Sequence, residues 1–200
     1  MNKIILIGGA PTIGKTYLAN KLSRDIKLPW ISTDIIRGLM QKVVRKEDYP
    51  ALFYPPMSIA KEYLEKHTPK EIMNDQNKES IVVWRGVQGI LDDGYPWESY
   101  IVEGVAILPG FVYKAMDKSK CILPIFLYED REDRIREVIF KRGLWDDADK
   151  YSDKLKEKEV SWVALFNKFI KRETSKYGLP IVRYRDDGSH FKEIKLLCGF

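Results

Sequence analysis

A glycine-containing segment of eight residues near the N-terminus restricts the fold of this chain more than any other part of its sequence. The segment reads Gly9-Ala10-Pro11-Thr12-Ile13-Gly14-Lys15-Thr16. An apolar, β-branched run at residues 3–7 precedes it, and residues 15–26 carry apolar side chains on one helical face. The spacing G-x-x-x-x-G-K-[ST] between a buried strand and a helix is typical of a loop that surrounds a phosphate with backbone amides. The sequence therefore predicts a nucleotide-phosphate site at these eight residues.

The residue types in this segment have distinct roles. Gly9 and Gly14 permit backbone angles at which successive N–H groups turn inward, and the following helix adds the positive end of its dipole. We expect Lys15 to reach the β- and γ-phosphates and Thr16 to place its hydroxyl on Mg²⁺. A chance glycine turn is the alternative, and the flanking strand and helix argue against it.

Strands and helices alternate along the rest of the chain. Apolar runs predict further strands at residues 28–31, 99–102, 121–128 and 179–184. Helical periodicity predicts helices at residues 34–44, 80–91, 130–142, 152–177 and 191–197. The helix at 34–44 would bury Ile35, Leu39 and Val43. This alternation indicates an α/β fold with a mainly parallel sheet and helices on both faces.

Charged residues follow two of the predicted strands. Asp34 ends the second strand and Arg37 lies one helical turn later, so Asp34 could orient or deprotonate an acceptor hydroxyl while Arg37 binds its phosphate or carboxylate. The alternative for Asp34 is that it only caps the helix. Glu103 ends the strand at 99–102, where it could hold Mg²⁺ through water or face the substrate. Each position lies at the carboxyl end of a strand, where α/β proteins bind ligands.

Several arginines are candidates for the acceptor side and for a mobile lid. Arg85 lies on the helix at 80–91 and could face the acceptor cleft, although a surface position is the alternative. Among the basic residues of the helix at 130–142 we favour Arg142, which precedes Gly143, as the group that neutralises the transferring phosphoryl. The others are Arg131, Arg134, Arg136 and Lys141.

The length of 200 residues fits one domain, and no linker or repeat divides the chain. Within this domain we expect residues 45–77 to be an irregular acceptor-side insertion and residues 142–152 to be the lid. The longest apolar run, residues 121–128, is too short to cross a bilayer, and no signal peptide precedes the first strand. We therefore expect a cytoplasmic protein without a membrane partner, in which Cys121 and Cys198 are free, buried thiols.

The charge balance also bears on partners. Lys and Arg number 34 against 29 Asp and Glu, which gives a net charge of +5 and a pI near 9.0. Such a balance suits either nucleic acid or a site that handles several phosphates. Because no basic stripe with interleaved aromatic residues is present, we do not expect nucleic acid as a partner. Two histidines are too few for a histidine-based zinc site.

Two further segments carry a resemblance to a known family. Residues 31–37, Ile-Ser-Thr-Asp-Ile-Ile-Arg, are similar to the I-S-T-D-x-x-R segment of 2-phosphoglycerate kinases. Residues 101–110, Ile-Val-Glu-Gly-Val-Ala-Ile-Leu-Pro-Gly, are similar to their I-I-E-G-V-H-x-x-P-G segment. With the loop at 9–16, these segments resemble the small-molecule and nucleoside-monophosphate kinase group of P-loop proteins. Ala106 departs from the histidine of that segment, and residues 143–150 are acidic where an arginine-rich stretch is typical.

The resemblance implies a P-loop NTPase fold, a three-layer α/β/α arrangement around a five-stranded parallel sheet of order 2-3-1-4-5. It implies ATP with Mg²⁺ as donor of the γ-phosphoryl group and a small phosphorylated or hydroxylated acceptor similar to 2-phosphoglycerate. The alternative acceptor, which the positive net charge permits, is a nucleoside, a nucleotide or a polynucleotide end. Lys15 and Thr16 would then serve phosphate and metal, with Asp34 and Arg37 at the acceptor. A nucleotide-dependent regulator that acts through a partner is the alternative outside the enzymes.

Overall fold

A five-stranded parallel sheet organises the structure, a computed structural model that describes residues 2–53, 60–93, 97–143 and 150–199. The strands lie in the order β2-β3-β1-β4-β5, which confirms the order expected from the resemblance. Their bounds are β1 Ile4–Gly9, β2 Trp30–Ser32, β3 Tyr100–Glu103, β4 Ile122–Tyr128 and β5 Ile181–Arg183. All pairings are parallel, as expected when helices connect successive strands.

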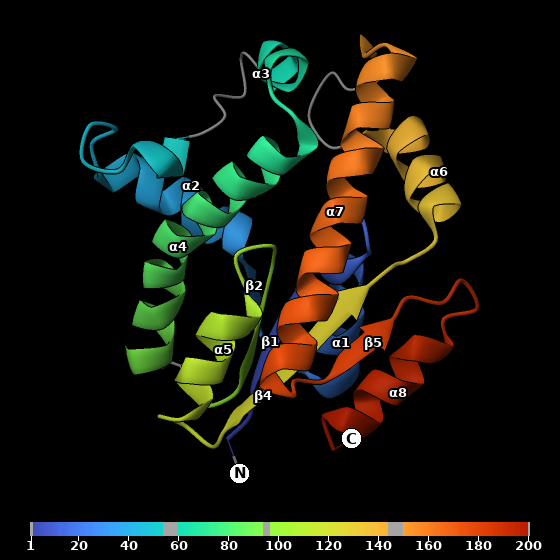
Figure 1. The fold of residues 1–200 in the computed structure, drawn as a ribbon. Coiled ribbons are helices and arrows are strands. Elements are labelled where there is room, and N and C mark those ends of the chain that lie inside the picture. The colour runs from blue at the N-terminus through green and yellow to red at the C-terminus, as the bar shows by residue number, and fades with distance from the viewer. Residues whose placement is uncertain (1, 54–59, 94–96, 144–149, 200) are drawn as a thin grey trace.

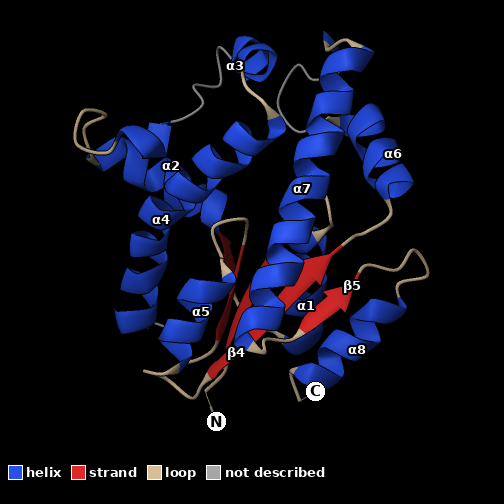
Figure 2. Ribbon diagram, in the orientation of Figure 1, coloured by secondary structure: helices blue, strands red, loops and turns tan. Residues whose placement is uncertain are grey.

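Helices cover both faces of this sheet, so the three-layer α/β/α architecture is confirmed. In the view of Figure 1, α1 lies behind the sheet, and α5 and α7 lie in front of it. Figure 2 shows the strands between these helical layers. The helical segments are α1 Lys15–Ile26, α2 Thr33–Val43, the 3-10 turn η1 Pro50–Phe53, α3 Ala60–Lys66, α4 Pro69–Asp93, α5 Pro109–Met116, α6 Glu132–Arg142, α7 Asp153–Tyr177 and α8 Ser189–Leu197.

The first strand forms the middle of the sheet and of the core. Ile5, Leu6 and Ile7 are fully buried, since β1 pairs with β3 on one side and β4 on the other. A strand that is covered on both faces needs a continuous apolar run, which explains the composition of β1 and β4. The register sets Ile7 opposite Glu103, so the loop that follows β1 leaves the sheet beside the end of β3.

The buried face of α2 differs from the one expected. Ile35, Leu39 and Val43 are 55%, 62% and 83% exposed, whereas Ile36 is buried. The helix carries apolar residues on two faces, and α4 packs against the face of Ile36 so closely that a Cβ at Gly86 would lie 2.5 Å from Ile36 Cγ2. Periodicity alone could not choose between these two faces, because only the position of α4 decides it.

The segment at 45–77 is also more regular than expected. It contains η1 and α3, and α4 begins at Pro69 rather than near residue 80. A capping box explains this start, because the Thr68 amide donates to Glu71 at 2.8 Å and the Glu71 amide donates to Thr68 Oγ1 at 3.3 Å. The T-P-x-E sequence was the signal for this helix start. Residues 54–59 lie outside the described residues, and the role as an acceptor-side insertion stays a prediction.

Two other features differ from the sequence interpretation or limit it. Helix α5 was not expected, and Cys121 is exposed although Cys198 is buried as predicted. Most of the proposed lid, residues 144–149 with the acidic stretch, lies outside the described residues. Within the described ranges, no helix has both the length and the apolar character needed to span a membrane.

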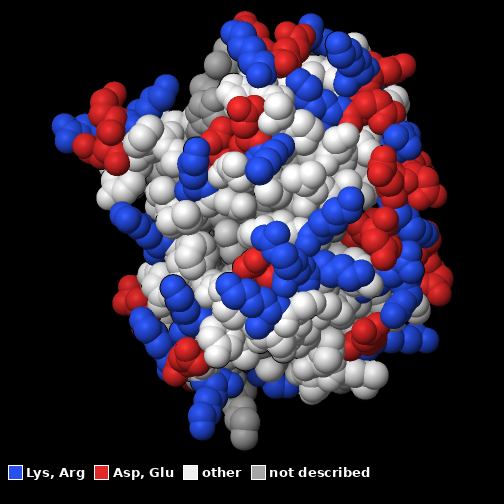
Figure 3. Space-filling view, viewed as in Figure 1, with Lys and Arg blue, Asp and Glu red and all other residues white. Residues whose placement is uncertain are grey.

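The surface around α7 carries charges of both signs. Figure 3 shows Lys and Arg side chains near the middle of this face, with Asp and Glu side chains interspersed among them and along the edges. Ion pairs on α6 and α7 include Arg172 with Glu173 at 3.1 Å and Arg136 with Glu157 at 2.8 Å. This mixture is typical of a solvated surface.

Candidate active site

The loop between β1 and α1 has an unusual backbone conformation. Gly9, Thr12 and Gly14 all have positive φ angles, of 141°, 66° and 86°. This conformation costs energy at Thr12, because a β-branched side chain rarely adopts it. The alternation of positive and negative φ turns successive N–H groups toward one side, and Gly14 leads directly into α1. The loop and the helix N-terminus together have the arrangement that is typical of an anion-binding site.

Lys15 lies almost fully buried beneath this loop. Its ammonium donates a 2.7 Å hydrogen bond to the carbonyl oxygen of Ala10, within the same loop. Burial lowers the pKa of Lys15 to about 8, while the carboxylates of Glu103 and Asp34 oppose this shift and Arg142 adds to it. The pKa of Lys15 therefore depends on Glu103, Asp34 and Arg142, three side chains that the sequence predicted at the site.

Glu103 lies at the end of β3 and faces the start of α1. The Thr16 hydroxyl donates a 3.1 Å hydrogen bond to Glu103 Oε1, and only 1% of the Glu103 residue is exposed. Burial raises the pKa of the Glu103 carboxyl, and Lys15 and hydrogen bonds from Ser32 and Thr16 oppose the shift. A hydroxyl and a carboxylate side by side are oxygen ligands of the kind that Mg²⁺ prefers.

The turn after β3 presses against the start of α2. Gly104 has a φ angle of 148°, and a Cβ there would lie 1.8 Å from Thr33 Oγ1. Only glycine allows this approach, which brings Glu103 next to the helix that carries Asp34.

Ser32, and not Asp34, caps the N-terminus of α2. The Ser32 hydroxyl accepts a 3.1 Å hydrogen bond from the Asp34 amide. The alternative in which Asp34 serves as that cap is therefore wrong, and its exposed carboxylate is available for chemistry.

A cavity of about 220 Å³ unites these groups. Five side chains predicted from the sequence to act at the site line it: Lys15, Thr16, Asp34, Glu103 and Arg142. Loop residues Pro11, Thr12 and Gly14 form another part of its wall, together with Tyr17, Gly104 and Val105. The remaining loop residues Gly9, Ala10 and Ile13 are not part of this wall, and all three are buried. The cavity thus combines the loop between β1 and α1 with a lysine, two carboxylates and an arginine at the end of α6.

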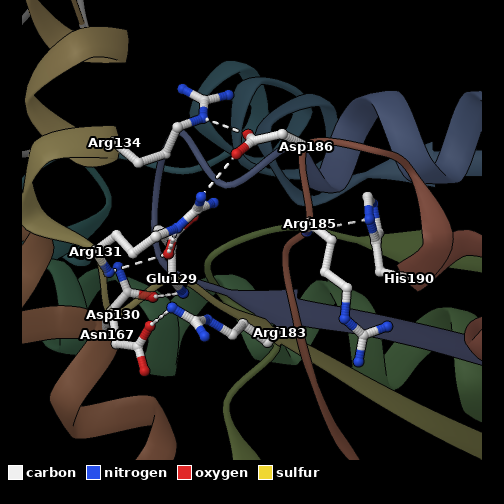
Figure 4. A network of polar contacts seen from close by, with 9 residues as sticks. All are labelled: Glu129, Asp130, Arg131, Arg134, Asn167, Arg183, Arg185, Asp186 and His190. Carbon is white, nitrogen blue, oxygen red and sulfur yellow. Dashed lines mark hydrogen bonds and ion pairs between the residues drawn. The ribbon is translucent and has the colours of Figure 1, made fainter.

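Arg131, which directly precedes α6, and Arg134 within α6 make ion pairs and do not line this cavity. Arg131 contacts Glu129 and Asp186 at 2.7 Å each, and Arg134 contacts Asp186 at 3.1 Å. Figure 4 shows both guanidinium groups directed toward Asp186, on the loop that follows β5. Of the described arginines, Arg142 is the one that lines the cavity.

Neither Arg37 nor Arg85 lines the cavity, although both were predicted to act at the site. Arg37 forms an ion pair with Glu79 of α4, and its Nε also lies 3.4 Å from the Leu52 carbonyl oxygen. The Arg85 guanidinium lies 5.7 Å from the centre of the Tyr49 ring. Neither is among the described residues that line the cavity.

Sequence reasoning missed Glu79. Its side chain is 8% exposed, and the Gln76 amide donates to Glu79 Oε2 at 2.6 Å. A signal was present, because Glu79 falls four residues before Val83 and eight before Val87 on the apolar face of α4. A carboxylate in that position has to find a partner when it is buried.

Known proteins share both the sequence pattern and the fold. No protein-family model matches the chain. It is 25% identical to a 2-phosphoglycerate kinase of Methanothermobacter thermautotrophicus, over 92% of this chain and 61% of that protein. It is 22% identical to a 2-phosphoglycerate kinase of Methanopyrus kandleri, over 90% and 55%. The chain therefore spans less than two thirds of the length of these curated relatives.

Solved structures extend the likeness to the whole fold. A gluconokinase from Sinorhizobium meliloti 1021 superposes with a TM-score of 0.52 at 13% identity, covering 99% of this chain and 92% of that one. A shikimate kinase from Bacteroides thetaiotaomicron gives a TM-score of 0.54 at 13% identity, covering both chains in full. These comparisons confirm the expected resemblance: the chain has the fold of P-loop small-molecule kinases and is similar in sequence to 2-phosphoglycerate kinases.

Proposed function

We propose that this protein is an ATP-dependent kinase that transfers the γ-phosphoryl group to a small, anionic acceptor similar to 2-phosphoglycerate. The observation that carries the proposal is the shared cavity, in which Lys15, Thr16, Asp34, Glu103 and Arg142 meet beside a phosphate-binding loop. The similarity to curated 2-phosphoglycerate kinases supports the choice of acceptor class.

The residues fit a nucleotide with Mg²⁺. The loop offers inward backbone amides, and the Thr16 hydroxyl and the Glu103 carboxylate offer oxygen ligands 3.1 Å apart. Thr16 would bind the metal directly and Glu103 directly or through water. When bound, Mg²⁺ supplies positive charge that offsets the negative charge of the β- and γ-phosphates.

The chain's own side chains perform the remaining work of alignment and charge stabilisation. Lys15 exchanges its hydrogen bond with the Ala10 carbonyl for one with the phosphates. Arg142 approaches the transferring group from the end of α6 and stabilises the charge on its equatorial oxygens. Asp34 orients the acceptor hydroxyl and takes its proton as the oxygen attacks. Phosphoryl transfer needs little covalent chemistry beyond this alignment.

The test is Mg²⁺-dependent release of ADP from ATP, measured with a panel of acceptors. The panel contains glycerate phosphates, sugar acids, nucleosides, nucleoside monophosphates and a 5′-hydroxyl oligonucleotide. We expect a large rate increase with a phosphorylated hydroxy acid and a loss of several orders of magnitude in the Lys15→Ala variant.

Each other outcome points elsewhere. A rate increase only with nucleosides, nucleotides or the oligonucleotide would replace the acceptor class. Tight ATP binding without acceptor-stimulated turnover would favour a nucleotide-dependent regulator instead. Turnover near the wild-type rate in Lys15→Ala would refute the assignment of the phosphate site itself.

A further inference from the structure

One helical turn from Asp34, α2 and α4 carry a pair of opposite charges: the partly buried Arg37 and the buried Glu79, which no role described so far explains. Glu79 is 8% exposed in its side chain and Arg37 is 24% exposed, and the two form an ion pair. Removing such groups from water costs several kcal/mol per ion unless good geometry compensates it. Stabilisation of the fold therefore does not by itself explain why Glu79 pairs with Arg37 here, and a role in positioning the Arg37 guanidinium is the alternative.

The contacts around the pair restrain it on several sides. Gln76 donates to Glu79 Oε2 at 2.6 Å, while Arg37 contacts the other carboxylate oxygen. The Leu52 carbonyl lies 3.4 Å from Arg37 Nε and accepts a 2.7 Å hydrogen bond from Gln41. Because a guanidinium is a rigid planar fork, contacts at Nε set the direction of the whole group.

The helices that carry the pair are themselves held together closely. Gly86 lies two helical turns beyond Glu79 on α4, and a Cβ there would approach Ile36 and Met40 of α2 to 2.5 and 2.9 Å. Arg37 follows Ile36 directly, so this close packing limits any sliding of Arg37 relative to Glu79. The pair thus lies at a rigid contact between two helices.

The pair is also electrostatically connected to the candidate base. Burial raises the pKa of Glu79 to about 7, with Arg37 opposing the shift most strongly and Asp34 adding to it. The Asp34 carboxylate is therefore near enough to affect Glu79, and it lies one helical turn from Arg37. An acceptor whose hydroxyl meets Asp34 would bring its anionic group within the neighbourhood of Arg37.

We infer that Glu79, supported by Gln76, is a positioning residue that orients Arg37 toward the anionic group of the acceptor. The inference rests on the proposed kinase function. Glu79 acts through Arg37 and does not contact the reacting atoms, so its removal should weaken acceptor binding without affecting the nucleotide side of the cavity.

The test compares steady-state constants of wild type, Glu79→Gln, Arg37→Gln and the double variant, using the acceptor found in the panel assay. Glutamine keeps the size of Glu79 and an oxygen for Gln76 but loses the charge. We expect Glu79→Gln to raise the KM for the acceptor at least tenfold, with the KM for ATP within twofold and kcat within threefold. In the Arg37→Gln background, Glu79→Gln should have no further effect on the acceptor KM.

Asp75→Asn serves as the matched control. Asp75 lies one turn earlier on α4 and pairs with the exposed Lys78 at 2.8 Å, so this variant also removes one carboxylate from the helix. We expect it to leave both KM values unchanged. Thermal unfolding of each variant shows which of them fold.

The outcomes separate this inference from the proposed function. A folded Glu79→Gln variant with the wild-type acceptor KM, or with equal changes in the KM values of acceptor and ATP, overturns the positioning role of Glu79 and leaves the proposed kinase function standing. Additive effects in the double variant overturn the action through Arg37. A wild-type protein without turnover of any acceptor overturns the proposed function, and the role of Glu79 with it.

Discussion

The Thr16 hydroxyl donates a 3.1 Å hydrogen bond to Oε1 of Glu103, which lies 87 residues later in the chain. The contact joins the first turn of α1 to the carboxyl end of β3, and it exists because β1 and β3 are neighbours in the sheet. One oxygen comes from the phosphate loop and the other from a separate strand. A metal that binds here therefore depends on the order of the strands as well as on the loop.

The first prediction concerns this pair. We expect Glu103→Gln to raise the Mg²⁺ concentration for half-maximal turnover about tenfold or more, because an amide oxygen is a weaker ligand than a carboxylate for a hard cation. The measurement is a Mg²⁺ titration at saturating ATP and acceptor. An unchanged Mg²⁺ requirement with a raised acceptor KM would assign Glu103 to the substrate instead.

The second prediction concerns Asp34. Since Ser32 caps α2, Asp34→Asn should leave the helix intact and lower kcat by about 10²- to 10⁴-fold, the usual contribution of a general base. The KM of the acceptor should change much less, because an amide still accepts a hydrogen bond. Steady-state kinetics with varied acceptor provide the check. A change confined to KM would reduce Asp34 to a binding role.

The third prediction distinguishes Arg142 from its neighbour. Arg142→Ala should lower kcat by about 10²-fold or more, as expected for loss of a group that stabilises charge in the transition state. Lys141→Ala removes the same charge from the preceding, exposed position and should leave kcat within twofold. Equal losses in both variants would indicate that only the overall charge of the helix end matters.

The fourth prediction concerns stability and pH. Glu159 on α7 is fully buried, and neither carboxylate oxygen has a hydrogen-bond partner among the described residues. Burial raises the pKa of Glu159 to about 7, with Lys156 opposing. The folded state thus binds the proton more tightly than the unfolded state. The resulting stability is present below about pH 4.5 and is lost as the pH rises through about 7.

Removing this carboxyl should reduce that loss. We expect Glu159→Gln to be more stable than wild type at pH 8, by about 1–3 kcal/mol, and nearly equal to it at pH 4.5. Urea unfolding at both pH values measures the difference. Glu79, whose pKa is also raised to about 7, would retain part of the pH dependence. The control is Glu157→Gln on the same helix, a half-exposed glutamate that pairs with Arg136. It should give no gain in stability at pH 8, and a gain similar to that of Glu159→Gln would contradict the role of burial.

The fifth prediction tests the contact between α2 and α4. Gly86→Ala should destabilise the protein by about 1–3 kcal/mol, because the new Cβ would overlap Ile36 and Met40. Gly89→Ala, three residues later in the same helix, meets nothing within 4 Å and should stabilise by about 0.5–1 kcal/mol through helix propensity. Chemical unfolding should show a lower free energy of unfolding than wild type for Gly86→Ala and a higher one for Gly89→Ala. Changes of the same sign in both variants would contradict the close packing at Gly86.

Local sequence was sufficient to predict the strand, loop and helix around residues 9–16 and most strands of the sheet. The helix at residues 15–26 has the predicted bounds, and Lys15 and Thr16 lie where the motif implies. Contacts within this segment join residues close in sequence, such as Lys15 and Ala10, so the order of amino acids determines them. Asp34 and Glu103 were also recognisable, since each follows an apolar strand whose carboxyl end faces the same edge of a parallel sheet.

Tertiary structure decided the features that depend on distant segments. Arg131, Arg134 and Arg142 share one short region, yet the first two pair with Asp186 on the loop after β5, and of the three only Arg142 lines the cavity. The buried face of α2 depends on the position of α4. Arg37 pairs with Glu79, which lies 42 residues later in the sequence. Periodicity and charge in the sequence identify the apolar faces and charged side chains of a segment. Long-range packing determines which other segment they contact, because those contacts form only when the whole sheet and its helices are assembled.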